Sequence, residues 1–197
     1  MKKIGITGGI GSGKTIVSKV FVLLGIPIYD SDTWAKKLMN EDEQLIQELK
    51  NTFGNDIYTP QNQLIPEKLA QKVFDNTQKL KQLNNLVHPK VRQHFEQWTT
   101  NQDQNLPYVI QESALIFEND LQKKLFKTIL VLASINTRIK RIKKRNPQLT
   151  ETQIQNIINK QIEPQKAIQL ADFIIQNDDT ELLLPQILAI HNQLSAL

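Results

Sequence analysis

Residues 8–15 form a glycine-rich segment whose residue types and spacing could bind phosphate. The segment reads Gly8-Gly9-Ile10-Gly11-Ser12-Gly13-Lys14-Thr15 and matches the phosphate-loop pattern G-x-x-x-x-G-K-[ST]. Small residues allow successive backbone N–H groups to converge on phosphate oxygens, and a helix beginning near Gly13 would add the positive end of its dipole. Lys14 is then expected to reach the β- and γ-phosphates of a nucleotide, and the Thr15 hydroxyl to bind Mg²⁺.

The distribution of glycine supports this interpretation. Five of the seven glycines fall at positions 5, 8, 9, 11 and 13, where they would let the backbone approach a ligand closely. A functionless glycine-rich turn is the alternative, but the β-like run before the segment and the helical pattern after it favour a phosphate site. The residues expected to contact the nucleotide are Gly8, Gly9, Gly11, Ser12, Gly13, Lys14, Thr15 and Ile16.

The nucleotide is expected to be ATP. Switch-type GTPases usually carry Asn-Lys-x-Asp for guanine, and the only Asn-Lys pair here, Asn159-Lys160, lacks the Asp. The Asp-x-x-Gly signature of those GTPases is also absent from the sequence.

Two acidic residues follow the second predicted strand, in Ile28-Tyr29-Asp30-Ser31-Asp32. A kinase that acts on a hydroxyl group needs a side chain that orients the hydroxyl or accepts its proton, and a carboxylate can do so. The alternative for Asp32 is a structural role as the N-cap of a helix beginning at Thr33. Glu112 follows the third predicted strand and could hold Mg²⁺ through water.

A basic segment predicts a helix with three arginines on one face, because Arg138, Arg141 and Arg145 are spaced i, i+3 and i+7. On a mobile hairpin these side chains could neutralise the charge of a transferring phosphoryl group. A solvated basic helix and a nucleic-acid patch are the alternatives. His88 precedes Pro89 and is interpreted as a residue at the start of a helix.

The elements that must position these residues alternate between strand and helix. Short β-branched runs predict strands at residues 3–7, 26–29, 108–110, 128–132 and 173–175. Apolar residues at helical spacing predict a helix over residues 15–24, which ends at Gly25. Such alternation indicates a parallel sheet with helices on both faces, in which ligands bind at the carboxyl ends of the strands.

Two stretches interrupt this alternation. Residues 33–105 are helical in pattern, with Pro66 and Pro89 each interpreted as a first helical residue. Residues 134–170 contain the basic helix and then a capping box, Thr150-Glu151-Thr152-Gln153, which opens another helix. We therefore predict a nucleotide-binding core (1–32, 106–133 and 171–197), a helical substrate lobe (33–105) and a lid (134–170).

The composition excludes several classes of protein. The 197 residues are 40% hydrophobic and 22% charged, as expected for a chain that buries a core. With no cysteine, a disulfide scaffold, a thiolate metal site and a cysteine nucleophile are excluded. No run of residues is apolar enough to span a bilayer or to form a signal peptide, so the chain is expected to be cytoplasmic. A net charge of +4 suits an anionic small molecule and also weak nucleic-acid binding.

The whole pattern resembles the dephospho-CoA kinase family. The resemblance rests on seven motifs that occur in order over essentially the whole chain: Thr7-Gly8-Gly9-Ile10-Gly11-Ser12-Gly13-Lys14-Thr15, Asp30-Ser31-Asp32, Leu86-Val87-His88-Pro89, Leu115-Ile116-Phe117-Glu118, Arg141 with Arg145, Gln161, and Ala171-Asp172-Phe173-Ile174-Ile175-Gln176-Asn177. The sequence departs from the family's usual residues at Ser31, at Glu112 and Ala114, and near Glu163-Pro164.

The resemblance implies a P-loop kinase-like, three-layer α/β/α fold with a parallel five-stranded sheet, a helical CoA-binding insertion and a lid. It implies transfer of the ATP γ-phosphate to the ribose 3′-hydroxyl of dephospho-CoA, with ATP and Mg²⁺ and without a nucleic-acid or membrane partner. By position, Asp32 would be the base, Lys14 a catalytic phosphate contact, and Thr15 a Mg²⁺ contact. Asp30 and His88 would bind the acceptor, while Arg141 (catalytic) and Arg145 (ATP-binding) would lie on the lid.

Two alternatives to that function remain at this stage. One is a nucleoside or nucleotide kinase with another acceptor. The other is a regulatory module that binds ATP without transferring phosphate, although such a module has no need of a carboxylate such as Asp32 beside the γ-phosphate. The sequence does not define an oligomeric state.

Overall fold

The computed structural model describes residues 1–74 and 76–197. The chain divides into two compact units, which are described separately below. The first unit, called the sheet unit, comprises Met1–Tyr29 and Gln102–Leu197, and the second, called the helical unit, comprises Asp30–Asn101. The predicted division of residues 134–170 from the core as a separate lid stays a prediction.

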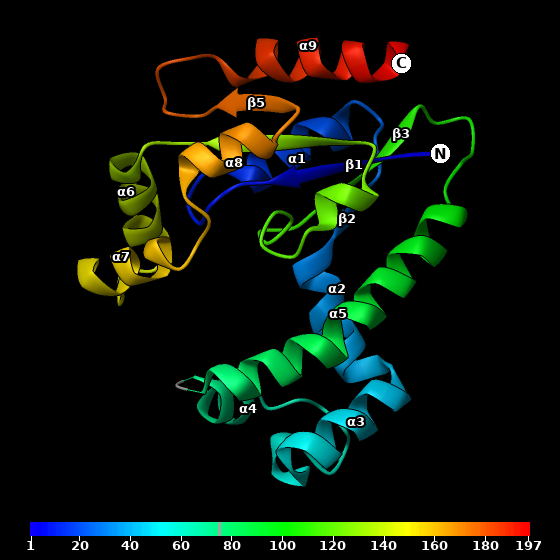
Figure 1. Ribbon diagram of the computed structural model, residues 1–197, viewed down its shortest axis with the longest axis vertical. Coiled ribbons are helices and arrows are strands. Elements are labelled where there is room, and N and C mark those ends of the chain that lie inside the picture. Colours follow the sequence, from blue (N-terminus) through cyan, green and yellow to red (C-terminus); the bar gives the residue numbers. More distant parts are fainter. Residues whose placement is uncertain (75) are drawn as a thin grey trace. The chain divides into compact units, whose positions relative to one another are not determined.

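A parallel sheet forms the centre of the sheet unit (Figure 1). Its five strands are β1 (Lys2–Thr7), β2 (Ile28–Asp30), β3 (Tyr108–Glu112), β4 (Lys127–Leu132) and β5 (Phe173–Gln176). They lie in the order β2-β3-β1-β4-β5, with β1 paired in parallel to both β3 and β4, and β4 in parallel to β5. The predicted α/β class and the five-stranded sheet are thereby confirmed.

Helices cover both faces of this sheet. The helices of the sheet unit are α1 (Lys14–Leu23), α6 (Ile135–Arg145), α7 (Glu151–Asn159), α8 (Pro164–Leu170) and α9 (Leu183–Ala196), with a short 3₁₀ turn, η2 (Leu121–Lys124). Alternate residues of a strand face opposite sides. Ile129 and Val131 therefore pack with α1 and α9, whereas Leu130 packs with Ala167 of α8 on the other face. This arrangement is the predicted three-layer P-loop kinase-like fold.

The helical unit is held together by its own apolar core. It contains α2 (Ser31–Glu41), α3 (Glu43–Phe53), η1 (Asn55–Ile57), α4 (Pro66–Val73) and α5 (Thr77–Thr100). Leu45, Leu49 and Ile57 have no exposed surface, and Phe95 is almost fully buried. Pro66 is the first residue of α4, as predicted, because its fixed φ suits the first helical turn.

The prediction that Pro89 begins a helix is wrong, because Pro89 lies inside α5. A proline at this place cannot donate a hydrogen bond to the carbonyl four residues earlier, which weakens the helix locally. Val87, Val91 and Phe95 are nevertheless buried along one side of α5, which contacts both α2 and α3. Burial of this apolar face outweighs the lost hydrogen bond, and the helix continues through Pro89. His88 therefore lies in the middle of α5 and not at the start of a helix.

The structural alternative for Asp32 is also wrong, because α2 begins at Ser31 and its N-cap is Asp30. One carboxylate oxygen of Asp30 accepts hydrogen bonds from the backbone N–H groups of Asp32 (3.0 Å) and Thr33 (3.2 Å). The other oxygen accepts a bond from the Thr33 hydroxyl at 2.6 Å. Strand β2 runs directly into α2, which moves the cap two residues earlier than expected.

Replacing Asp30 with alanine is expected to lower the free energy of unfolding by about 1 kcal/mol, because the first-turn amides of α2 lose their acceptor. Asp30→Asn is the control, since asparagine caps about as well as aspartate. Urea unfolding of the two variants measures the difference. An alanine variant as stable as the asparagine variant would show that the cap contributes nothing.

Other local predictions agree with the structure. Thr150 caps α7, and the reciprocal bonds of the predicted capping box to Gln153 are both present. Gly25 follows α1 with φ +82°, a left-handed conformation that suits glycine at the end of a helix. Local sequence chemistry is thus sufficient to define these helix ends.

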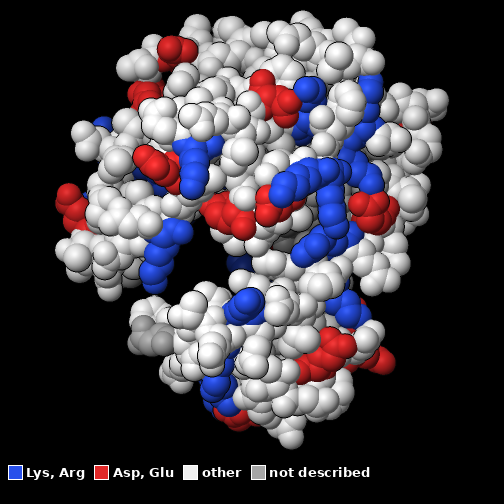
Figure 2. All heavy atoms as spheres, in the orientation of Figure 1, with Lys and Arg blue, Asp and Glu red and all other residues white. Residues whose placement is uncertain are grey.

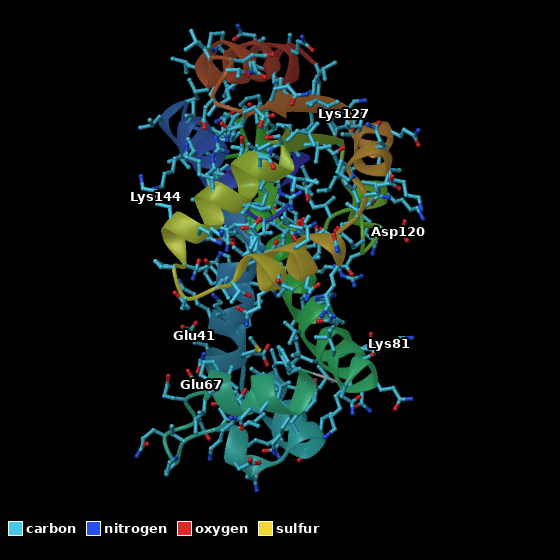
Figure 3. The ribbon with its side chains drawn as sticks, turned by 90° about the vertical axis from the view of Figure 1, so that its left-hand side faces the viewer. Glu41, Glu67, Lys81, Asp120, Lys127 and Lys144 are labelled. Atoms are coloured by element: carbon cyan, nitrogen blue, oxygen red, sulfur yellow. The ribbon has the colours of Figure 1, made fainter. Side chains whose placement is uncertain are left out.

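The surface carries mixed charge. Figure 2 shows basic and acidic side chains interspersed on the visible face, in keeping with the small net charge of +4. Figure 3 shows the basic helix α6 with Lys144 near its end. Within residues 1–74 and 76–197, no helix is both long and apolar enough to cross a membrane.

Candidate active site

The loop between β1 and α1 has a backbone conformation that only glycine adopts easily. Gly11 has φ +78° and Gly13 has φ +94°. A Cβ atom on Gly13 would also collide with the side-chain amide nitrogen of Asn177. Asn177 is buried, and its amide nitrogen donates to the backbone oxygen of Ser12 at 2.7 Å. Gly13 therefore provides both the turn into α1 and the space for Asn177.

The N-terminus of α1 is open for an anion. Gly13 occupies its N-cap, and no side chain among the described residues caps this helix. The first-turn N–H groups of a helix lack the usual acceptor four residues earlier and can bind phosphate oxygens, although the Ile16 N–H here bonds to the Gly13 carbonyl at 3.0 Å. The Ser12 hydroxyl, 1% exposed, also has no hydrogen-bond partner within the described chain. The uncapped end of α1 and the Ser12 hydroxyl fit a polyphosphate.

Lys14 places a positive charge on the same loop. Its ammonium group donates a hydrogen bond to the backbone oxygen of Gly8 at 2.6 Å. The side chain thus folds back over the loop rather than extending into solvent. Contact between Lys14 and the β- and γ-phosphates stays a prediction.

Thr15 and Glu112 lie on neighbouring parts of the sheet unit. Glu112 pairs with Ile6 in the sheet and accepts a hydrogen bond from the Ser18 hydroxyl at 2.6 Å. Ser18 and Thr15 are three residues apart on α1, so their side chains share one helix face. This places the Glu112 carboxylate along the face that carries the Thr15 hydroxyl. Ile16, predicted to contact the nucleotide, is 57% exposed on α1.

No group of three or more His, Asp or Glu side chains in residues 1–74 and 76–197 could form a metal cluster. A Mg²⁺ ion in a phosphoryl-transfer site is usually held by one or two protein oxygens together with substrate phosphates and water. Thr15 and Glu112 fit that limited role.

Arg141 of α6 contacts the phosphate loop. Its guanidinium donates to the Ser12 backbone oxygen at 3.3 Å and to the side-chain oxygen of Asn177 at 3.3 Å. It also forms an ion pair with Asp179 at 2.7 Å. Arg145, by contrast, is exposed and donates to its neighbour Asn146 at 3.0 Å. The structure therefore brings Arg141, but not Arg145, to the loop.

Two further side chains bind the loop: Arg138, one of the three arginines expected on one helix face, and Gln161, for which no site role was predicted. Arg138 is 6% exposed, and its Nε donates to the Ile10 backbone oxygen at 2.8 Å. Its Nη2 donates to Gln161 Oε1 at 2.5 Å, and the same oxygen accepts the Ile10 N–H at 3.0 Å. Burial lowers the pKa of Arg138. The shared face with Arg141 was the available signal for Arg138, and Gln161 was part of the family resemblance.

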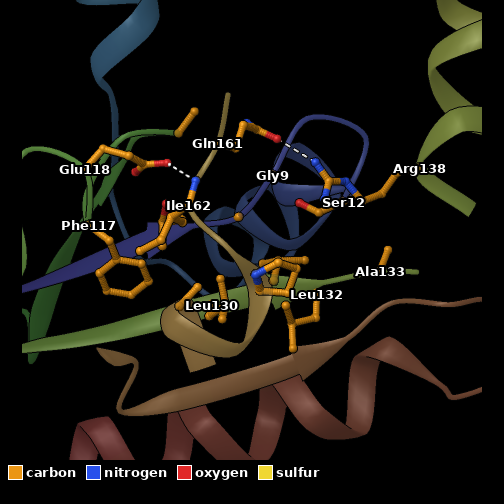
Figure 4. Close-up of a pocket in the computed structure, with 16 residues that line it drawn as sticks. Gly9, Ser12, Phe117, Glu118, Leu130, Leu132, Ala133, Arg138, Gln161 and Ile162 are labelled. Atoms are coloured by element: carbon orange, nitrogen blue, oxygen red, sulfur yellow. Dashed lines mark hydrogen bonds between the residues drawn. The ribbon is translucent and has the colours of Figure 1, made fainter. Parts of the chain in front are cut away.

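A pocket adjoins this part of the loop, as the close-up in Figure 4 shows. Its floor is apolar and includes Phe117 and Leu130, while Gly8, Gly9 and Arg138 lie on its polar side. Glu118 is exposed and accepts the Ile162 backbone N–H at 3.1 Å. Glu118 thereby fixes the chain that follows α7.

The remaining predicted site residues belong to the helical unit. Asp30 is the N-cap of α2, and Asp32 is exposed in the first turn of that helix. His88 is half-buried in α5, and burial, assisted by the charge of Arg92, lowers its pKa. At neutral pH, His88 is therefore a neutral side chain that can donate or accept a hydrogen bond.

Comparisons with known proteins agree on one family. A family model described as Dephospho-CoA kinase matches residues 2–182. A dephospho-CoA kinase from Bacteroides fragilis is 34% identical over 186 residues, which cover 94% of this chain and 89% of that protein.

Solved structures give the same result at the level of the fold. A Thermus thermophilus crystal structure superposes with a TM-score of 0.83 and 28% identity, covering 100% of this chain and 97% of that one. A dephospho-CoA kinase from Campylobacter jejuni superposes with a TM-score of 0.73 and 24% identity, covering 100% and 98%. Sequence, fold and the arrangement of the phosphate loop thus lead to one conclusion: the chain belongs to the dephospho-CoA kinase family.

Proposed function

We propose that this protein transfers the γ-phosphoryl group of ATP to the 3′-hydroxyl of the ribose of dephospho-CoA, giving coenzyme A and ADP. Membership of the family supports an ATP-dependent kinase with this acceptor. The observation that carries the proposal is the open N-terminus of α1 behind a loop shaped by glycine, with Lys14 folded over it. These groups bind a polyphosphate and leave its outermost phosphoryl group accessible.

The phosphate loop would stabilise the transferring group electrostatically. Its backbone N–H groups, together with the Lys14 ammonium, offset the charge of the β- and γ-phosphates. Arg141, which already contacts the loop, would add a second cation when it leaves Asp179. Arg145 would reach the nucleotide only after a movement of α6 or of its own side chain.

A bound Mg²⁺ would neutralise charge on the phosphate oxygens. The Thr15 hydroxyl would hold it directly and Glu112 would hold it through water. Glu112 is bonded to Ser18, which lies on the same face of α1 as Thr15. The hydrogen bond from the Ser18 hydroxyl fixes where the Glu112 carboxylate lies.

Asp32 would act on the acceptor. Its carboxylate would accept the proton of the 3′-hydroxyl as the new oxygen–phosphorus bond forms and the bond to the ADP oxygen breaks. Asp30 caps α2, so this cap does not depend on Asp32. Asp30 and His88 would bind the acceptor.

We further propose that the enzyme works in the cytoplasm on small molecules alone, without nucleic acid or membrane as a partner. The family resemblance supports this assignment, and the small net charge of +4 is compatible with it.

The test is an acceptor panel. Purified protein is given ATP and Mg²⁺ with dephospho-CoA, with nucleosides, with nucleotides or with no acceptor, and ADP release is measured. We expect turnover with dephospho-CoA only, and the product should carry phosphate at the 3′ position. Strong turnover with a nucleoside would instead indicate a nucleoside kinase. Nucleotide binding without turnover in any sample would indicate a regulatory ATP-binding module.

A further inference from the structure

Ile10, at the tip of the phosphate loop, has both of its backbone groups bound by side chains from far along the chain. Gln161 Oε1 accepts its N–H at 3.0 Å, and Arg138 Nε donates to its carbonyl at 2.8 Å. The two side chains are joined to each other at 2.5 Å (Figure 4). We call this three-way arrangement of Arg138, Gln161 and Ile10 the Ile10 clamp.

Apolar packing supports the Ile10 clamp from the other side. The Ile10 side chain packs against a buried cluster that contains Ile142 of α6 and Ile154 and Ile158 of α7. The tip of the loop is therefore attached to the α6–α7 hairpin by both its side chain and its backbone. A phosphate loop needs no such attachment in order to present its N–H groups.

The glycines of the loop accommodate Arg138 closely. A Cβ atom on Gly9 would collide with the Arg138 guanidinium, and one on Gly11 would collide with the Arg138 backbone. The guanidinium thus lies directly against Gly9, one of the loop residues expected to contact the nucleotide. Within the described chain its hydrogen bonds go to a carbonyl and an amide oxygen rather than to a carboxylate.

We propose that Arg138 and Gln161 are positioning residues for nucleotide binding, which hold Ile10 in the phosphate-binding conformation and couple the loop to the α6–α7 hairpin. A buried guanidinium that has no carboxylate partner among residues 1–74 and 76–197 also raises the positive potential at the loop, where a polyphosphate is the compensating anion. This inference rests on the proposed function for the identity of the nucleotide, but not for the acceptor.

The coupling limits how residues 134–170 can move as a lid. Arg138 lies in the first turn of α6, so the N-terminal end of this helix is attached to the loop. A lid movement that leaves the loop in place must therefore occur beyond Arg138, or else it must carry Ile10 with it.

The first test compares Arg138→Leu with Lys144→Gln by titration with MgATP and, separately, with dephospho-CoA. Lys144 is an exposed cation on the same helix (Figure 3) and serves as the matched control. We expect Arg138→Leu to weaken MgATP binding by about 10-fold to 100-fold, as for a lost pair of charge-assisted hydrogen bonds. Dephospho-CoA affinity should stay unchanged, and Arg138→Lys should recover part of the loss because it keeps the charge and one donor.

A purely structural role gives a different result. It would lower the thermal stability of Arg138→Leu but leave the MgATP affinity of the folded protein within about twofold of the wild type. That outcome, or an equal loss of affinity for both ligands, would overturn the proposal. An inactive wild-type protein that still binds MgATP would overturn the acceptor assignment instead, so the two failures are distinguishable.

The second test does not require Arg138→Leu to fold. Gln161→Leu removes the amide oxygen that accepts the Ile10 N–H. Gln161→Glu replaces that oxygen with a carboxylate oxygen, which can accept the same bond. We expect faster amide hydrogen exchange at Ile10 and weaker MgATP binding in Gln161→Leu. Gln161→Glu should recover the slow exchange but not the MgATP affinity, because its carboxylate would offset the charge of Arg138 beside the loop. Unchanged exchange at Ile10 in Gln161→Leu would show that the Ile10 clamp does not hold the loop.

Discussion

Replacing Lys14 with alanine is expected to lower kcat/KM by about 10²–10³-fold, with both MgATP affinity and phosphoryl transfer reduced. The ammonium group of Lys14 lies over the loop, 2.6 Å from the Gly8 backbone oxygen. No neutral side chain at this position offsets the charge of the β- and γ-phosphates. Isothermal titration with MgATP and a steady-state assay with dephospho-CoA measure the two effects separately.

Lys19 supplies the matched control for this prediction. It is an exposed lysine on the same helix, α1, so Lys19→Ala removes the same charge from the same element without touching the loop. Normal affinity and rate in Lys14→Ala, or equal losses in both variants, would contradict the assignment of Lys14 to the phosphates.

Replacing Asp32 with asparagine is expected to reduce kcat by about 10²–10⁴-fold while leaving MgATP affinity close to that of the wild type. Asparagine keeps the size of the side chain but cannot accept the proton of the 3′-hydroxyl. A smaller loss is expected if the transition state is loose, since little proton transfer has then occurred when the phosphorus–oxygen bond breaks. Single-turnover measurements with saturating ATP and dephospho-CoA report the chemical step.

The position of the α2 cap and a control variant on the same helix make the Asp32 experiment decisive. Asp30, and not Asp32, caps the helix, so a loss of activity in Asp32→Asn cannot be attributed to a lost cap. Glu41→Gln removes a carboxylate from the opposite end of the same helix and is the matched control (Figure 3). If Asp32→Asn retains a nearly normal kcat, another group must activate the acceptor, and Asp32 has no catalytic role.

The groups at the phosphate loop come partly from the loop segment itself and partly from distant elements. Lys14 and the α1 amides come from one continuous segment, whereas Arg138, Arg141, Gln161 and Asn177 reach that segment from α6 and from the ends of α7 and β5. Loss of Lys14 should therefore remove charge and the bond to the Gly8 carbonyl, both of which lie within the segment itself. Loss of Arg138 should alter the loop itself.

Features that depend on neighbouring residues were predictable from the sequence. The phosphate loop is a run of consecutive residues, and its ability to bind anions follows from small side chains and exposed amides in that run. The strand–helix alternation, the Gly25 helix end and the Thr150 capping box likewise depend on local backbone preferences. The fold class and the family followed from these.

Features that depend on burial were not predictable in the same way. Pro89 is an unfavourable residue for the interior of a helix, yet α5 continues through it because Val87, Val91 and Phe95 are buried. Asp32 and Asp30 are equally good caps by residue type, and only the direct passage of β2 into α2 decided between them.

The amino-acid sequence by itself determined which backbone would bind phosphate, which residue types surround it, and to which family the chain belongs. Only the tertiary structure decided which distant side chains support that backbone. Arg138 and Gln161 are separated from Ile10 by 128 and 151 residues, and no local preference links positions so far apart. They meet because α6 and α7 bury isoleucines against Ile10, and this packing places a guanidinium and an amide beside its peptide groups.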